Sequence, residues 1–309
     1  MTGRPTPNGG DSLGDAPGRG RLEIFKEHRK TLFAIAYRML SSVSDAEDML
    51  QDAFIRWQQA AEAEIRSPRA FLVTIVTRLC LNHLQSARVR REEYFGQWLP
   101  EPLLTESADD FSAVDQVDDS LSMAFLVLLE RLTPIERAVL LLREVFEYDY
   151  PEIAEILDQT EVNCRQILRR ARQHVAENRP RFDTSPHQRE RLMKEFLQAT
   201  SGGDLQRLVA LLADDVTLRS DGGGKGPALP VEIRGADNVG RGLLGGSKKL
   251  VPPNLVIRLT RVNGELGIVS YLDRKPFAVI TLALVDRKIH GIYIVSNPEK
   301  LAHLPALAS

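Results

Sequence analysis

A chain of 309 residues suggests two or three domains, and its net charge of −2 is too small for the whole molecule to bind nucleic acid by electrostatic attraction. Its two cysteines, Cys80 and Cys164, fall inside predicted helices, which excludes a disulfide framework and a zinc-ligand cluster. No segment is apolar enough to span a membrane, and the start of the chain lacks the apolar core of a signal peptide. We therefore expect a cytoplasmic protein with a disordered tail over residues 1–20.

Charge is segregated along the chain. Residues 66–91 contain six arginines and no acid, and residues 165–181 contain six arginines and one glutamate. Between these two segments, residues 101–120 contain seven acids and no basic residue. Two basic segments on either side of an acidic connector predict two separate contacts with nucleic acid.

The first predicted domain, residues 21–94, begins with two amphipathic helices. The first covers residues 22–40, and the second follows a cap at Ser44 and buries an apolar stripe that includes Phe54 and Trp57. The polar side of the second helix consists of Asp45, Asp48, Gln51, Asp52 and Arg56. Acidic residues in a first turn complement the helix dipole, which explains the first two members of this set but explains the others less well.

A third helix begins at Ser67 and Pro68 and continues through the first basic segment. Its projecting polar residues are Arg78, Asn82, Gln85, Arg88, Arg90 and Arg91. Basic groups without a single acid favour contact with phosphates over a merely solvated surface. The two amide side chains in the set can in addition hydrogen-bond base edges.

The predicted linker, residues 95–120, begins with an apolar stretch before its acidic part. This stretch consists of Trp98, Leu99, Pro100, Glu101 and Pro102. Two prolines at this spacing prevent a helix and hold the chain extended. A large aromatic residue in a linker indicates either a local hydrophobic staple or a docking site elsewhere on the molecule, and we favour docking.

The next predicted domain, residues 121–183, contains a helix-turn-helix. Thr133 caps a first helix that has Pro134 at its first position, and a short helix follows over residues 151–157. After a turn at residues 158–160 a last helix begins. The residues that its periodicity directs inward are Val162, Ile167, Leu168 and Ala171.

This last helix is polar near its start and rich in arginine. Such a helix can enter a major groove, with its early residues on base edges and its arginines on phosphates. The residues expected to contact DNA are Thr160, Asn163, Arg165, Gln166, Arg169, Arg170 and Arg172. The alternative is a solvated basic face on three small helices. We favour binding to duplex DNA because helix, short turn and capped basic helix agree.

The last predicted domain, residues 186–309, has an α+β pattern. Two helices, over residues 186–200 and 205–212, precede a run of β-type segments, and a further short helix falls near residues 236–244. The expected strands cover residues 216–219, 255–262, 266–272, 277–285 and 288–295, with hairpin turns at 262–265 and 286–288. The fold class is therefore two all-α domains followed by a cone-like α+β domain.

A glycine-rich loop interrupts this pattern. It consists of Asp221, Gly222, Gly223, Gly224 and Lys225. Three glycines permit positive φ and a close approach of the backbone to another group. The spacing does not match a phosphate-binding loop, and no helix follows directly. We interpret the segment as a contact or regulatory loop.

Taken together, these patterns resemble a bacterial sigma factor of the extracytoplasmic-function (ECF) group over residues 22–181. The second helix is similar to the region 2 helix that binds the clamp helices of the polymerase β′ subunit, the third helix to the reader of the −10 element, and residues 132–175 to region 4, which reads the −35 element. The resemblance implies that core polymerase contacts Asp45, Asp48, Gln51, Asp52, Arg56 and Trp57. It also implies that Arg78 and Asn82 face the melted strand.

Residues 186–309 resemble the SnoaL/NTF2-like fold. With WLPEP in the linker, DGGGK in the loop and NPEKL near the end, the chain is similar to ECF sigma factors that carry a fused SnoaL-like domain. This resemblance implies core RNA polymerase (β′ clamp helices and β flap) and promoter DNA as partners, no cofactor, no separate anti-sigma factor, and regulation in cis. The expected regulatory contacts are residues 98–102, residues 221–225, Asn297 and Pro298. A small-molecule effector in the C-terminal domain is also compatible.

Two other function classes stay open on sequence alone. One is a stand-alone regulator that binds DNA and senses a ligand, although such a protein has no need for the polar face of the second helix. The other is an enzyme, for which the candidate residues are Asp221, Tyr271, Asp273, His290 and Tyr293. No acid–base spacing among these residues indicates a reaction, and a fold alone does not confer chemistry, so we expect no enzyme.

Overall fold

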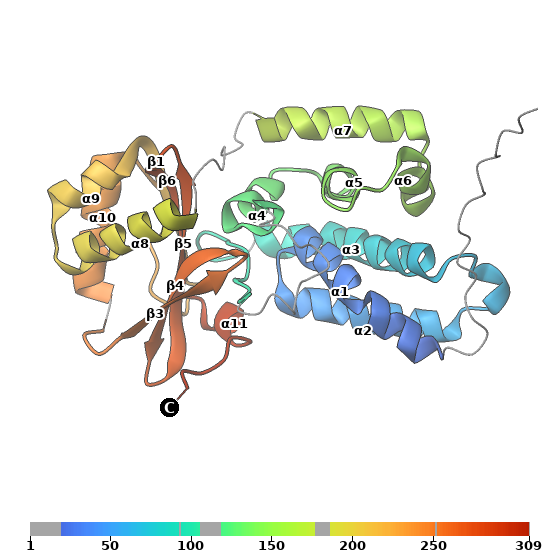
Figure 1. Cartoon of the computed structure of the whole chain (residues 1–309), viewed down its shortest axis with the longest axis horizontal. Coiled ribbons are helices and arrows are strands. Elements are labelled where there is room, and N and C mark those ends of the chain that lie inside the picture. Colours follow the sequence, from blue (N-terminus) through green and yellow to red (C-terminus); the bar gives the residue numbers. More distant parts are fainter. Residues whose placement is uncertain (1–19, 93, 106–118, 177–185, 251, 309) are drawn as a thin grey trace, which may run out of the picture.

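The computed structural model describes residues 20–92, 94–105, 119–176, 186–250 and 252–308. Two groups of helices form one side of the molecule, and a curved sheet with its own helices forms the other (Figure 1). The expected fold class is therefore confirmed. The predicted tail and the acidic part of the linker fall on residues 1–19 and 106–118, outside the described residues. No described helix has the length and apolar character needed to cross a membrane.

The N-terminal helical region consists of α1 (Arg21–Leu40), α2 (Val43–Gln59) and α3 (Pro68–Glu92), with a short 3-10 helix (Glu62–Glu64) before α3. The cap of α2 is Ser42 rather than Ser44. The Ser42 hydroxyl accepts a hydrogen bond from the N–H of Asp45 at 3.1 Å, which satisfies one free donor of the first turn. Cys80 lies fully buried within the region. Burial also raises the pKa of its thiol, as expected for a small core residue.

The second helical region consists of α4 (Met123–Leu129), α5 (Pro134–Glu144), α6 (Tyr150–Leu157) and α7 (Glu161–Ala176). Capping boxes fix the starts of α5 and α6: Thr133 pairs with Glu136, and Asp149 pairs with Glu152. The sequence does not predict α4. Its seven residues are all apolar and all buried, so they show no helical alternation of apolar and polar positions.

One hydrophobic cluster joins the two helical regions, with Leu32 and Trp57 on one side and Leu126 and Leu141 on the other. The part of α7 that packs into it consists of Cys164, Ile167, Leu168, Ala171 and Val175. The prediction that Val162 points inward is wrong, because its side chain is 63% exposed. At about 3.6 residues per turn, the buried positions of α7 lie on the side of the helix opposite Val162.

The C-terminal domain consists of α8 (Pro186–Ser201), α9 (Leu205–Leu211), β1 (Leu212–Asp221), β2 (Ile233–Arg234), α10 (Ala236–Leu250), β3 (Val256–Val262), β4 (Glu265–Leu272), β5 (Lys275–Val285), β6 (Lys288–Val295) and α11 (Pro298–Leu301). The strands form one sheet in the order β2-β1-β6-β5-β4-β3. The β1–β6 pair is parallel, with Asp221 opposite Val295, and the other pairs are antiparallel. The ends of β1 and β6 therefore emerge side by side.

Two-residue turns connect the antiparallel strands within each hairpin. Asn263 and Gly264 join β3 to β4 with φ values of 54° and 76°, which places the predicted Asn-Gly turn in the primed form that matches strand twist. Asp286 and Arg287 make the second predicted turn, between β5 and β6, in the same way. A third turn of this kind joins β4 to β5.

Each face of the sheet has a different cover (Figure 1). Helices α8, α9 and α10 pack on one face, where Phe196 and Leu208 meet Ile268 and Ile292. On the other face, α4 and the linker residue Leu99 pack against strands β4, β5 and β6. The core of the C-terminal domain is therefore completed by residues from the helical part of the chain.

Candidate functional site

One face of α2 is polar and open to solvent. Asp48, Gln51, Asp52 and Arg56 are all exposed at helical spacing, so they form one stripe. Ile55, which is 52% exposed, lies within this stripe, although the sequence analysis assigns it no role. Asp45 is partly buried, with its carboxylate 3.4 Å from Nε2 of His83. One exposed apolar side chain with polar ones around it can serve as a small protein-binding surface with a polar rim.

The predicted DNA-contacting residues of α3 share a face, but the first of them is engaged elsewhere. Arg78, Asn82 and Gln85 are exposed at four- and three-residue spacing. The guanidinium of Arg78 donates hydrogen bonds to the main-chain oxygens of Ile156 at 2.9 Å and Glu155 at 3.2 Å, the last carbonyls of α6. The side chains of Arg88, Arg90 and Arg91 lie outside the described part of the structure. In this arrangement α3 and α6 are therefore held together.

The start of α7 is built as predicted. The Thr160 hydroxyl accepts a hydrogen bond from the N–H of Asn163 at 3.2 Å and so caps the helix. The amide side chain of Asn163 donates to the Gln159 side chain at 2.6 Å. Gln166 is exposed one turn further along.

The arginines of α7 divide into two pairs. Arg165 forms an ion pair with Glu161 at 3.0 Å and lies 4.5 Å above the ring of Tyr150. Arg172 pairs with Glu144 of α5, and the hydrogen bond from this carboxylate raises the pKa of Arg172. Among the described residues, Arg169 and Arg170 have no hydrogen-bond or ion-pair partner and are exposed. This second pair is free to meet phosphates.

Residues 98–102, which we call the linker strap, bind both the C-terminal domain and the N-terminal helical region. The Leu99 side chain is fully buried against the sheet, and the Leu99 N–H donates to Oδ2 of Asp221 at 2.8 Å. At the other end, the Glu101 carboxylate accepts hydrogen bonds from the N–H groups of Val43 at 2.7 Å and Ser44 at 3.3 Å. These donors belong to the first turn of α2, where the helix dipole favours an anion. The predicted docking role of the apolar linker is thus realised as a physical contact at both ends.

Asp221 is the centre of the contact with the strap. It is completely buried at the end of β1. Its carboxylate accepts hydrogen bonds from the Tyr94 hydroxyl at 2.6 Å, the Gly223 N–H at 3.0 Å and Nζ of Lys300 at 2.8 Å, besides the one from Leu99. A buried carboxylate requires this number of donors, because an unsatisfied charge in the interior is costly.

Two residues beyond the predicted set complete this site. Lys300 is buried, bonds the carbonyl of Leu99 as well as Asp221, and lies 4.0 Å from the Trp98 ring and 5.1 Å from the Tyr94 ring. Tyr94 also accepts a hydrogen bond from Asn297 at 2.8 Å. Burial, followed by the hydrogen bond to the Asp221 carboxylate, raises the pKa of Tyr94, so its hydroxyl stays protonated and remains a donor.

The glycines of the loop after β1 are required by its shape. Gly223 and Gly224 have φ values of 56° and 71°, and a Cβ on Gly223 would collide with the side chain of Asn297. Gly222 lies too close to the carbonyl of Gly226 to carry a Cβ. Lys225 does not join the buried contact and instead pairs with Glu299 at the surface. The loop is therefore a tightly folded support for Asp221.

A second contact between the C-terminal domain and the N-terminal region lies at the β3–β4 turn. Asn263 is fully buried and donates from its side chain to the Tyr37 hydroxyl of α1 at 2.6 Å. Tyr37 in turn donates to the carbonyl of Glu101 at 2.6 Å. Asn263 also exchanges hydrogen bonds with Leu103 of the linker, and Leu104 forms a β-bridge to Val262.

Comparison with known proteins shows the family to which this chain belongs. Residues 24–90 match the model of Sigma-70 region 2, and residues 122–175 match that of Sigma-70, region 4. The ECF RNA polymerase sigma factor SigJ of Mycobacterium tuberculosis is 35% identical over 294 residues, which are 91% of this chain and 93% of SigJ. This chain belongs to the family of ECF RNA polymerase sigma factors. The probable ECF sigma factor SigI of the same organism is 33% identical over 284 residues, 91% of this chain and 95% of SigI.

The crystal structure of M. tuberculosis SigJ is similar to this chain over most of its length. It superposes with a TM-score of 0.75 at 32% identity and covers 93% of this chain and 100% of that chain. The sigma factor resemblance inferred from the sequence is therefore confirmed. So is its function: a sigma factor directs RNA polymerase to promoters, which removes the stand-alone regulator from consideration. The N-terminal helical region is region 2, and the second helical region is region 4.

The structure corrects one residue of the sigma factor's predicted polymerase-binding set. Trp57 is only 2% exposed, and its indole N–H donates to the carbonyl of Arg21 at 2.9 Å. Arg21 in turn bonds main-chain oxygens at the end of α2 and lies 5.6 Å from the indole ring. Trp57 is a core residue that joins α1 to α2 and is not part of the exposed α2 face.

The enzyme candidates of the sigma factor's C-terminal domain have other partners. Tyr271 and Tyr293 are buried on the sheet face that α4 covers, and burial raises the pKa of Tyr293. His290 pairs with Asp215 at 3.0 Å, and Asp273 lies in the exposed β4–β5 turn. The Asp221 carboxylate is occupied by hydrogen bonds from Tyr94, Leu99, Gly223 and Lys300. Among the described residues, no group of three or more His, Cys, Asp and Glu side chains is suited to hold a metal ion.

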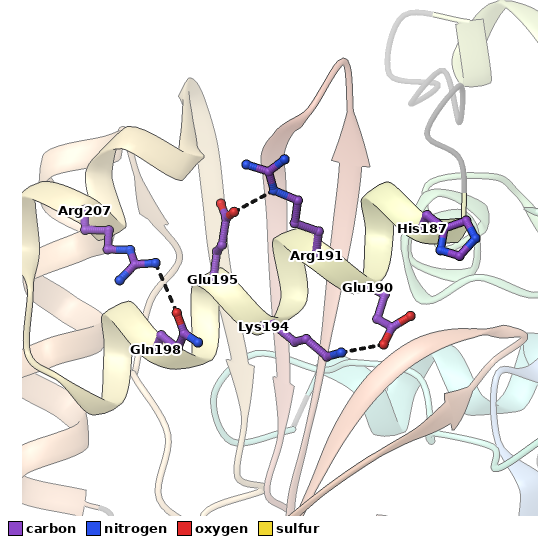
Figure 2. A pocket seen from close by; sticks show the side chains of 7 residues that line it. All are labelled: His187, Glu190, Arg191, Lys194, Glu195, Gln198 and Arg207. Carbon is purple, nitrogen blue, oxygen red and sulfur yellow. Dashed lines mark hydrogen bonds and ion pairs between the residues drawn. The ribbon is translucent and has the colours of Figure 1, made fainter.

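A polar groove runs along the solvent side of α8 and continues to Arg207 of α9 (Figure 2). Its side chains pair with one another: Arg191 with Glu195, Lys194 with Glu190, and Arg207 with Gln198. Figure 2 shows these pairs lying along the helix instead of converging on one point. The groove is therefore a solvated helix surface whose charges are paired locally.

Proposed function

We propose that the C-terminal domain regulates this sigma factor in cis by setting the position of region 2 through the linker strap. The observation that carries this proposal is that the strap is bound at both ends. Asp221 and Lys300 of the C-terminal domain hold Leu99, and the first turn of α2 holds Glu101. A change at the Asp221 end is therefore transmitted to α2 over three residues of chain.

In this proposal, helix α2 provides the surface that binds core polymerase. Its exposed stripe of Asp48, Gln51, Asp52 and Arg56, with Asp45 beside it, is the surface we expect to bind the β′ clamp helices. The strap is hydrogen-bonded to the N-terminal end of this helix. Binding or release of the strap therefore affects the orientation and stability of the stripe. The second contact, from Asn263 to Tyr37, supports the same arrangement from α1.

The contact between α3 and α6 restricts how α3 can bind DNA. Arg78 cannot bond the last carbonyls of α6 and also face a melted strand. Capture of flipped −10 bases by α3 therefore requires that region 4 move away from Arg78. Base extrusion costs a few kcal/mol, and the energy of breaking this contact adds to the cost that binding at any promoter must offset.

The remaining partner assignments stay predictions. The −10 element is expected at Arg78, Asn82 and Gln85 together with Arg88, Arg90 and Arg91, and the −35 element at the exposed residues of α7. We expect region 4 to contact the β flap, no separate anti-sigma factor, and a cytoplasmic location. A small-molecule effector would act by loosening or tightening the strap.

The test compares Asp221→Asn with Lys225→Ala in the full-length chain. Core polymerase binding is measured first, and then run-off transcription from a promoter that the holoenzyme selects from a randomised library. We expect Asp221→Asn to bind core polymerase and to change transcription several-fold, whereas Lys225→Ala leaves it unchanged. Higher transcription from Asp221→Asn than from the wild type would mean that the strap restrains region 2. Lower transcription would mean that the strap positions region 2 for initiation. Equal transcription from both variants would contradict the proposal.

Point variants test the proposal better than removal of the C-terminal domain. Helix α4 of region 4 packs on the sheet through Met123, Ala124 and Val127. Truncation would expose these residues to water and add an aggregation defect to any regulatory effect.

A further inference from the structure

The exposed face of α7 contains one apolar side chain. Val162, Gln166, Arg169 and Gln173 occupy this face at four- and three-residue spacing, and all four are exposed. Val162 is 63% exposed and lies in the first turn of the helix. A single exposed valine is common on protein surfaces and by itself means little. Its position on this particular face is what gives it meaning.

The polar neighbours of Val162 are held by other parts of region 4. Asn163 bonds Gln159, and Arg165 is fixed between Glu161 and the Tyr150 ring. In the first two turns of α7, the side chains that project outward from the centre of the face are therefore Val162 and Gln166. Arg169 follows one turn later, where its free guanidinium can reach a phosphate.

Helix-turn-helix proteins place the early residues of their second helix on base edges in the major groove. Valine has no hydrogen-bonding group, so it distinguishes bases there by apolar contact alone. The apolar feature that base pairs present in the major groove is the C5-methyl group of thymine. Cytosine, which carries hydrogen at that carbon, offers no equivalent contact.

We propose that Val162 is a specificity-determining residue that packs against the C5-methyl group of one thymine in the −35 element. This inference rests on the proposed contact of region 4 with that element and adds one base to it. From the sequence the contact is missed, because the apolar Val162 is grouped with Ile167 and Ala171, which lie on the opposite side of the helix.

The first experiment uses the full-length chain bound to core polymerase and a promoter library randomised over the −35 element. The wild-type holoenzyme is expected to select thymine at a position that Val162→Ala leaves unselected, with the other positions unchanged. Val231→Ala is the matched control, since Val231 is 66% exposed in the C-terminal domain and undergoes the same chemical change. Neither valine is buried, so both variants should fold, which circular dichroism verifies.

The second experiment removes the methyl group from the DNA. In the selected promoter, each −35 thymine is replaced in turn by deoxyuridine. At one position, wild-type affinity should fall about fourfold, the effect of losing one buried methyl group, and Val162→Ala should be insensitive to the same replacement. The two changes together form a double-mutant cycle between one side chain and one methyl group.

The outcomes separate this inference from the proposal beneath it. If the holoenzyme selects a −35 sequence but Val162→Ala selects the same one, or if deoxyuridine has no effect at any thymine, the inference is overturned and region 4 binding stands. If the wild-type library shows no preference anywhere in the −35 element, the proposed −35 contact fails, and the inference fails with it.

Discussion

Two ion pairs connect the same two segments of the C-terminal domain, the loop after β1 and helix α11. Asp221 pairs with Lys300, and Lys225 pairs with Glu299. The side chains of the first pair are 0% and 8% exposed, and those of the second are 57% and 69% exposed. The segments and the charge types are the same, so the difference lies in the linker strap, which covers one pair and not the other.

The buried pair depends on groups that the C-terminal domain does not supply. Leu99 and Tyr94 provide two of the donors to the Asp221 carboxylate, and Trp98 lies over Lys300. If the strap dissociates from the C-terminal domain, Asp221 and Lys300 become exposed to water or lose hydrogen-bond partners. The Lys225–Glu299 pair is unaffected. The comparison therefore teaches that the buried ion pair, and not the exposed one, holds the strap on the C-terminal domain.

The largest effect is expected when the buried pair is broken. Asp221→Ala leaves the Lys300 charge in a buried site and should lower the free energy of unfolding by about 3–5 kcal/mol, measured by urea denaturation. Lys225→Ala removes an exposed pair and should change it by about 0–1 kcal/mol. Equal losses from the two variants would show that burial by the strap does not set the difference.

The other end of the strap provides the next effect. Glu101→Gln keeps the shape of the side chain but removes the charge that faces the α2 N–H groups, and should cost about 2 kcal/mol. Hydrogen exchange in the first turn of α2 should become faster. Glu47→Gln is the control, because it removes a charge from the next turn of α2, where Glu47 pairs with Arg29 at the surface. If exchange rises equally in both, the strap is not what holds this turn.

A smaller effect is expected at the contact between α3 and α6. Arg78→Ala leaves the last carbonyls of α6 without their donor and should cost about 1 kcal/mol, with faster hydrogen exchange in α6. Gln85→Ala changes the same face of α3 and should leave α6 unchanged. Protection of α6 that survives Arg78→Ala would mean that the apolar cluster alone joins the two regions.

The smallest effect extends the comparison of paired and free charges to α7. Arg169→Ala should reduce the slope of log affinity for promoter DNA against log salt concentration by about one, because a free arginine contributes one phosphate contact. Arg172→Ala should reduce it less, since Arg172 is already paired with Glu144. A larger reduction from Arg172→Ala would show that DNA displaces the Glu144 contact.

Much of the local structure follows from the sequence because local rules decide it. Thr133 caps α5, and the Asn263-Gly264 turn closes its hairpin, as their residue types require. The same rules cannot show what a residue contacts at long range. Asn263 is predicted as a turn residue, yet its side chain also bonds Tyr37 from the other end of the chain.

The candidate site was harder to predict for the same reason. Lys300 and Lys225 are both single lysines in recognisable motifs, and nothing local distinguishes the buried one from the exposed one. Trp57 and Val162 show the converse error. Trp57 satisfies both an apolar stripe and a polymerase-binding motif, and Val162 is apolar but lies opposite the stripe of α7 that packs into the core.

The parallel pairing of β1 with β6 has a consequence for the time at which the strap can bind the C-terminal domain. Asp221 and Lys300 meet because the two strands end side by side, yet β6 and α11 follow every other element of the domain along the chain. A ribosome releases regions 2 and 4 before it releases Lys300, and domains fold in that order during synthesis. The nascent sigma factor therefore acquires its helices first, and the buried contact between the C-terminal domain and the strap forms only after Lys300 emerges.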